Sequence, residues 1–152
     1  MSLTILVDAD ACPVKDEIYK VALRHDVAVK IVSNSAFRVL AHPLVERIVV
    51  GSAFDEADDW IAERAGASSI VITADILLAD RCLKAGALVL SPTGKPFTDN
   101  SIGGAIATRA IMADLRAGAG VTGGPAPFAQ KDRSRFLAAL DEALVKLKRT
   151  AR

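Results

Sequence analysis

The sequence is poor in aromatic residues and contains no long apolar run. Aromatic residues make up 5% of the 152 positions and apolar residues 51%, so a buried core must consist mainly of Ala, Val, Leu and Ile. No stretch reaches the roughly 18 consecutive apolar residues that cross a bilayer, so we expect no contact with a membrane. The N-terminal apolar run is short and meets an acid at position 8, so we expect no signal peptide.

Cysteine and net charge are also low. Cys12 and Cys82 are the two cysteines, too few for a disulfide framework, and we expect both as free thiols in the reducing cytoplasm. The net charge is +1, so composition alone neither indicates nor excludes nucleic acid as a partner. A chain of 152 residues has the length of one ordinary domain, and we expect a single domain over residues 1–152.

Apolar runs alternate with amphipathic segments along the chain. The runs predict strands at residues 3–7, 27–33, 47–50, 69–75 and 87–91. The amphipathic segments predict helices from Pro13 to about residue 25 and over residues 55–65, 76–85, 101–117 and 130–149. Residues 92–100 form a loop or a small hairpin. The alternation predicts a three-layer α/β fold, in which a mainly parallel five-stranded sheet carries helices on both faces.

Acidic side chains follow two of the predicted strands. In "TILVDAD", Asp8 and Asp10 come directly after the first strand, and "VITAD" ends the fourth strand with Asp75. Asp80 follows five residues later, and Asp58 lies near the start of the helix before the fourth strand. Ligands of open parallel sheets bind beyond the carboxyl ends of the strands. If the first and fourth strands are neighbours, these acids therefore converge on one edge of the sheet.

A cluster of carboxylates without basic partners is electrostatically costly, and a divalent cation removes that cost. Hard oxygen ligands suit Mg²⁺ or Mn²⁺. We therefore expect a Mg²⁺ or Mn²⁺ site at this edge. The structural alternative is that a strand-end Asp caps the helix that follows it, although two acids at alternate positions exceed what one cap needs.

Several separated sequence blocks together resemble one bacterial family. The blocks are "VDADACPVKDEIYKVA", "GSAFDEADDWI", "VITADILLADRCLKAGA", "TDNSI" with Arg109 downstream, and "TGGPAPF" followed by "DR". In this order, from near residue 4 to past residue 136, they resemble the UPF0178 family, also called YaiI/YqxD or DUF188. That family is grouped with PIN-like domains, which are metal-dependent nucleases with acids at the carboxyl edge of a parallel sheet. Leu77 departs from the pattern, because relatives commonly have Pro after "ADI".

The resemblance implies a role for each acid. Asp8 takes the place of the first-strand acid, Asp58 that of the mid-chain acid, and Asp75 with Asp80 that of the pair after the fourth strand. Asp10 is an additional acid of the family's own "DAD" block. The implied metal ligands are Asp8, Asp58, Asp75 and Asp80, and all five acids are candidate catalytic residues. The implied reaction is hydrolysis of nucleic acid, RNA in preference to DNA, by metal-activated water. PIN-like relatives often dimerise, which leaves a homodimer open.

Polar residues near other strand and helix ends are candidate substrate contacts. Ser33, Asn34 and Arg38 follow the second strand, while Asn100 and Arg109 lie at the start of a predicted helix and within it. Each could orient a phosphate group of the substrate. The structural alternatives are a turn in which Ser and Asn bond to their own backbone, and a helix cap at Asn100 or Ser101.

Two other functions remain open. "DAD" after a first strand is also similar to haloacid dehalogenase-type phosphatases, in which Asp8 would carry an aspartyl-phosphate and Asp10 would be the general acid. Against this alternative, Cys12 stands where those enzymes favour Thr or Val. The third function is a module without catalysis that uses the same acids to bind a metal or nucleic acid.

Overall fold

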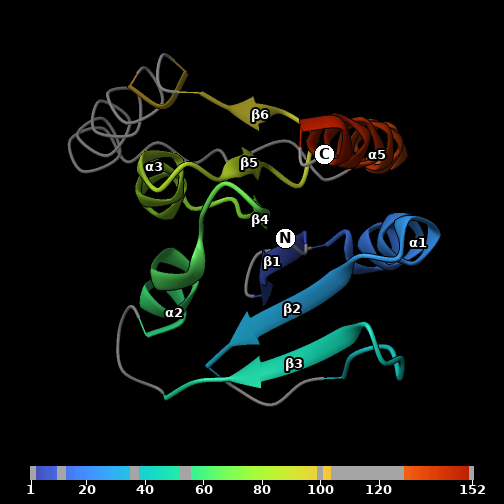
Figure 1. Cartoon of the computed structure of the whole chain (residues 1–152), viewed down its shortest axis with the longest axis horizontal. Helices are drawn as coiled ribbons and strands as arrows, with labels where there is room; N and C mark the ends of the chain where they lie inside the picture. The colour runs from blue at the N-terminus through green and yellow to red at the C-terminus, as the bar shows by residue number, and fades with distance from the viewer. Residues whose placement is uncertain are drawn as a thin grey trace, which may run out of the picture.

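Strands and helices alternate along the chain as the sequence predicts (Figure 1). The computed structural model describes residues 3–9, 13–34, 38–51, 56–98, 101–103 and 129–150. Its strands are β1 (Thr4–Asp8), β2 (Ala28–Ser33), β3 (Val45–Val49), β4 (Ser69–Ile72), β5 (Leu88–Leu90) and β6 (Pro96–Phe97). Its long helices are α1 (Lys15–His25), α2 (Glu56–Arg64), α3 (Ile76–Lys84) and α5 (Gln130–Thr150). Of the helix predicted over 101–117, only residues 101–103 are described, and these are helical.

The strands form one six-stranded sheet in the order β3-β2-β1-β4-β5-β6. Strands β1 to β5 are parallel, and β6 is antiparallel to β5. The α/β fold with a mainly parallel sheet is therefore confirmed. The sheet has a sixth strand, β6, because the chain after β5 turns back in a small hairpin. A hairpin was one of the two forms expected for residues 92–100. Strands β1 and β4 are direct neighbours, with Val7 opposite Ile72. The condition for the strand-end acids to share an edge is thus met.

Helices cover both faces of the sheet, as predicted. Helices α1 and α5 lie side by side on one face, and α2 and α3 lie on the other (Figure 1). Successive side chains of a strand point to opposite faces. Ile5 and Val7 of β1 therefore pack with α1 and α5, whereas Leu6 between them packs with α2 and α3. Burial on both faces explains why β1 is a continuous apolar run.

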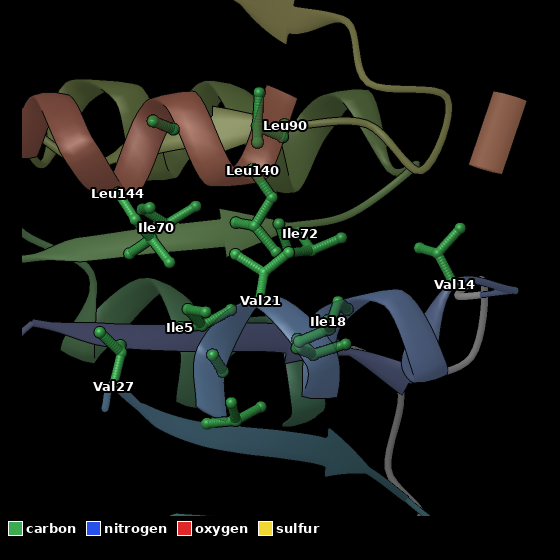
Figure 2. Close-up of a cluster of buried hydrophobic side chains, with 14 of the residues drawn as sticks. Ile5, Val14, Ile18, Val21, Val27, Ile70, Ile72, Leu90, Leu140 and Leu144 are labelled. Carbon is green, nitrogen blue, oxygen red and sulfur yellow. The ribbon is translucent and has the colours of Figure 1, made fainter. Parts of the chain in front are cut away.

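The C-terminal helix α5 fastens the face that carries α1. Phe136, Leu140 and Leu144 are fully buried, which confirms the apolar stripe expected for this helix. Figure 2 shows Leu140 and Leu144 in one cluster with Ile5, Ile18 and Val21. This packing supplies the apolar contact between α5 and the helix that directly follows the acidic end of β1.

Polar contacts hold both ends of α5 to α1. Near its start, the Arg133 guanidinium donates to the carbonyl of Pro13 at 2.7 Å and to Glu17 Oε1 at 3.3 Å. Near its end, Lys148 Nζ donates to the carbonyl of His25 at 2.7 Å. In the middle of α5, Asp141 Oδ1 lies 2.6 Å from His25 Nε2. Since Arg133 reaches Pro13, two residues before α1, α5 supports the start of that helix.

None of the helices in the described ranges combines the length and apolar character required to span a bilayer. Even α5, with 21 residues, carries charged residues along its length.

Candidate functional site at the carboxyl edge of the sheet

Asp8 is a buried carboxylate at the end of β1, one of the two central strands of the sheet. The whole residue is 7% exposed to solvent. It lies two residues after Leu6, so its side chain is on the face that α2 and α3 cover. Asp8 Oδ2 accepts a hydrogen bond from Thr73 Oγ1 at 3.0 Å. A buried carboxylate requires such partners, because its desolvation is costly.

Thr73 connects the ends of β1 and β4. It follows β4 directly and is 1% exposed. Its hydroxyl donates to Asp8 Oδ2 and also accepts the backbone N–H of Asp75 at 3.0 Å. A single hydroxyl thus joins two of the predicted site residues. The sequence analysis missed Thr73, although a polar residue between the apolar run "SIVI" and an acid was a usable signal.

Asp75 caps helix α3. Its Oδ1 accepts the backbone N–H groups of Leu77 at 2.9 Å and Leu78 at 3.3 Å. The cap that we weighed as an alternative to a functional role is therefore present. Oδ2 of the same carboxylate makes no hydrogen bond to any residue that the structure describes. Capping uses one oxygen and fixes the direction of the other.

The other two predicted metal ligands lie on the helices. Asp80 Oδ2 accepts a hydrogen bond from Lys84 Nζ at 2.8 Å, one turn further along α3. Asp58 is half-buried on α2, and its negative charge acts on Cys82 of α3. The neighbouring Asp59 joins the two helices through a 2.9 Å ion pair with Arg81. Asp80 and Asp58 thus have interactions of their own within this helix pair.

Cys82 of α3 is a fully buried free thiol. Burial raises the pKa of the Cys82 thiol to about 11, the nearby Arg81 opposes this rise, and Asp58 adds to it. A thiol with this pKa remains protonated at neutral pH. Cys82 is therefore a packing residue of the core and supplies no nucleophile to the site.

The structure brings Asp8 and Asp75 together through Thr73. Across the part of the chain that it describes, no three His, Cys, Asp or Glu side chains gather closely enough to hold one metal ion. The predicted convergence of four carboxylates is thus not seen as one group. Asp10 lies outside the described residues. Mg²⁺ often needs only one or two carboxylates, with water completing its shell. The donors Asp8 and Asp75 fit such an ion, and the roles of the five acids stay predictions.

The predicted substrate contacts are only partly described. Ser33 is 3% exposed, and its carbonyl accepts the N–H of Val50 at 2.9 Å. Val32 pairs with Asp8, so Ser33 lies at the same edge of the sheet. Asn34 and Arg38 are exposed. The predictions for Asn100 and Arg109 fall outside the described residues.

Comparisons with known proteins give a consistent result. Residues 6–146 match the family DUF188, described as "Uncharacterized BCR, YaiI/YqxD family". A UPF0178 protein of Sphingopyxis alaskensis is 72% identical over 146 residues, which cover 95% of each chain. One of Nitrobacter winogradskyi is 59% identical over 148 residues, which cover 97% of this chain and 94% of the relative. No solved structure matches the chain. The protein therefore belongs to the UPF0178 (YaiI/YqxD, DUF188) family, as the sequence blocks predicted.

Proposed function

We propose that this protein is a divalent-metal-dependent phosphodiesterase that acts on RNA. The proposal depends on one observation: Asp8, buried at the end of β1, shares the hydroxyl of Thr73 with the backbone of Asp75 at the end of the adjacent strand. This edge is where parallel sheets bind ligands. Buried acids at such an edge are candidates for function. The same placement is implied by the resemblance to PIN-like nucleases.

Mg²⁺ or Mn²⁺ would be held by Asp8 and Asp75, with Asp10, Asp58 and Asp80 as the further acids that the resemblance implies. When bound, such an ion stabilises charge on phosphoryl oxygens and makes bound water more acidic. Ionised carboxylates offer only acceptor oxygens, which suits a hard cation. Thr73 orients Asp8 by donating to Oδ2, and the cap of α3 orients Asp75 through Oδ1. Both carboxylates are therefore positioned before any ligand arrives.

The RNA backbone would contact polar groups around the same edge. Ser33, Asn34 and Arg38 follow β2, next to β1, and Asn100 and Arg109 are the other proposed contacts. Phosphate contacts position a nucleic acid without reading its sequence. We also propose that the protein acts in the cytoplasm, and that a homodimer is its assembly to test first.

The test is cleavage of a labelled single-stranded RNA oligonucleotide by the full chain in the presence of Mn²⁺ or Mg²⁺. We expect cleavage by the wild type, none after chelation, and none by Asp8→Asn. The matched control is Asp26→Asn, which removes the same charge beyond α1, at the opposite edge of the sheet. Asn tolerates the left-handed backbone that Asp26 adopts, with φ of 58°.

Parallel purification of all three proteins separates the chain's own activity from a contaminating ribonuclease, which would cleave equally in every sample. The proposal is overturned if Asp8→Asn cleaves as fast as the wild type. It is also overturned if neither metal supports cleavage.

A further inference from the structure

A cavity of about 540 Å³ lies at the amino edge of the sheet, opposite the acids. Its lining comprises Thr4 and Leu6 of β1, Lys30 of β2, Arg64 of α2, and residues 66–69, which lead into β4. The rise of a strand is about 3.3 Å per residue, so the five residues of β1 separate Thr4 from Asp8 by roughly 13 Å. The cavity is therefore distinct from the candidate site at the carboxyl edge.

The lining contains two cations and no acid. Lys30 is half-buried and makes no hydrogen bond or ion pair with the residues that the structure describes. Glu46 lies opposite Lys30 on β3, but it is exposed and forms no ion pair with it. The Lys30 ammonium group still reaches solvent, so it is accessible to an anion that enters the cavity.

Arg64, the second cation of the lining, is held in place by its neighbours on α2. Its guanidinium lies 4.0 Å from the centroid of the Trp60 ring, and Nη1 donates to the Trp60 carbonyl at 3.0 Å. Its partner in an ion pair is Glu63 at 3.6 Å, and the Arg64 side chain is still 47% exposed. Nε and Nη2 donate to none of the described residues. A guanidinium stacked in this way loses little freedom when it binds an anion.

We propose that this cavity binds a small phosphorylated organic molecule of about mononucleotide size. Lys30 and Arg64 hold the phosphate, because an ammonium group and a planar guanidinium fork are the usual protein partners of phosphate oxygens. Ala67, which is exposed, offers apolar surface to the organic part, and the Thr4 hydroxyl offers a hydrogen bond. The volume lies within the range of small-molecule sites, about 300–1,000 Å³. The site does not depend on the proposed nuclease activity.

The test is isothermal titration of the full chain with AMP, inorganic phosphate and adenosine at about 150 mM salt, where surface charges are screened. We expect AMP to bind, phosphate to bind more weakly, and adenosine not to bind. Lys30→Gln and Arg64→Gln should each weaken AMP at least about tenfold, the effect of losing one charge-assisted hydrogen bond. Arg64→Lys retains the charge and should weaken AMP less than Arg64→Gln.

Two controls isolate the cavity. Lys20→Gln removes an exposed cation on α1 and should leave AMP affinity unchanged. Asp8→Asn should also bind AMP like the wild type. A failed nuclease assay therefore leaves this inference standing, and a failed AMP titration leaves the proposed nuclease function standing. The inference is overturned if neither AMP nor phosphate binds at about 10 mM. Thermal melting checks that Lys30→Gln is folded. The inference is equally overturned if this folded variant binds AMP as tightly as Lys20→Gln does.

Discussion

The Thr73 hydroxyl meets a carboxylate on one side and a backbone N–H on the other, and it is almost completely buried. Each partner is itself part of the candidate site. At the scale of single residues, this hydroxyl sets the relative positions of Asp8 and Asp75. Its loss therefore affects stability and site geometry together.

We predict that Thr73→Val lowers the free energy of unfolding by about 2 kcal/mol, because it removes a hydrogen bond from each of two groups in a buried place. Val has nearly the same size as Thr, so the loss comes from the hydrogen bonds and not from a cavity. Thr73→Ser retains the hydroxyl and should be the more stable of the two variants. Urea denaturation of both gives the comparison. Equal stability of Thr73→Val and the wild type would show that the hydroxyl contributes nothing net.

The acids at the strand ends could be predicted from sequence, because an apolar run followed by Asp marks the end of a buried strand. The role of Thr73 could not be predicted in the same way. Its contact with Asp8 joins residues 65 positions apart. It depends on the register of β1 against β4, which no local pattern specifies. Similarly, the sequence left open whether Asp75 caps a helix or serves a site, and its two oxygens permit both.

At the scale of elements, the hairpin between β5 and β6 packs against the start of α5. Gly94 in this hairpin has φ of +87°, and a Cβ there would lie 2.8 Å from the carbonyl carbon of Arg135. Gly86, which follows α3, also has a positive φ, but a Cβ there would meet only Ala67 N at 3.8 Å. Gly66 has nothing within 4 Å and no positive φ. Substitution of Gly86 therefore tests backbone strain alone, substitution of Gly94 tests strain together with steric contact, and Gly66 is the control without either.

We predict a graded loss of stability on substitution by Ala. Gly66→Ala should change the free energy of unfolding by less than about 0.5 kcal/mol. Gly86→Ala should cost about 1–2 kcal/mol, because a side chain strains the left-handed backbone. Gly94→Ala should cost more, because its Cβ also displaces α5. Urea denaturation ranks the three, and amide exchange in α5 should quicken only in Gly94→Ala. A Gly94→Ala variant as stable as Gly66→Ala would contradict the packing of hairpin on helix.

Most elements could be predicted because their apolar patterns are long. The predicted stripe of α5 is buried as expected, and β1 and β2 lie within one residue of their predicted bounds. Strand β3 was predicted to begin at residue 47, but it begins at Val45. The prediction missed the first two residues because the charged Glu46 separates Val45 from the apolar run that follows. This strand lies at the edge of the sheet, where exposed charged residues are tolerated and discourage pairing with other chains.

At the scale of the whole molecule, a net charge of +1 conceals two regions of opposite character. Acids follow the central strands at the carboxyl edge, whereas two cations without an acid line the cavity at the amino edge. The first region could be predicted, because its acids stand next to recognisable strands. The second could not, since Lys30 lies within one strand and Arg64 at the end of a distant helix. Only the fold brings these two together.

Metal binding at the carboxyl edge should stabilise the whole fold, because an ion that binds only the folded chain shifts the unfolding equilibrium. At about 100 times its dissociation constant, the gain is about 2.7 kcal/mol. For a chain of this size that corresponds to a rise in Tm of roughly 5–10 °C. We predict this rise with Mn²⁺ for the wild type, and its loss in Asp8→Asn and Asp75→Asn, measured by thermal melting with and without metal.

The substitutions are chosen to preserve the fold. Asn caps a helix about as well as Asp, so Asp75→Asn should retain the start of α3 while losing a charged ligand. Asp26→Asn, at the opposite edge, should retain the full rise. An equal rise in all four proteins would place the ion elsewhere and contradict the proposed site. A rise confined to proteins with intact Asp8 and Asp75, without any RNA cleavage, would instead favour the module that binds metal without catalysis. Melting curves and cleavage assays together therefore separate the site from its chemistry.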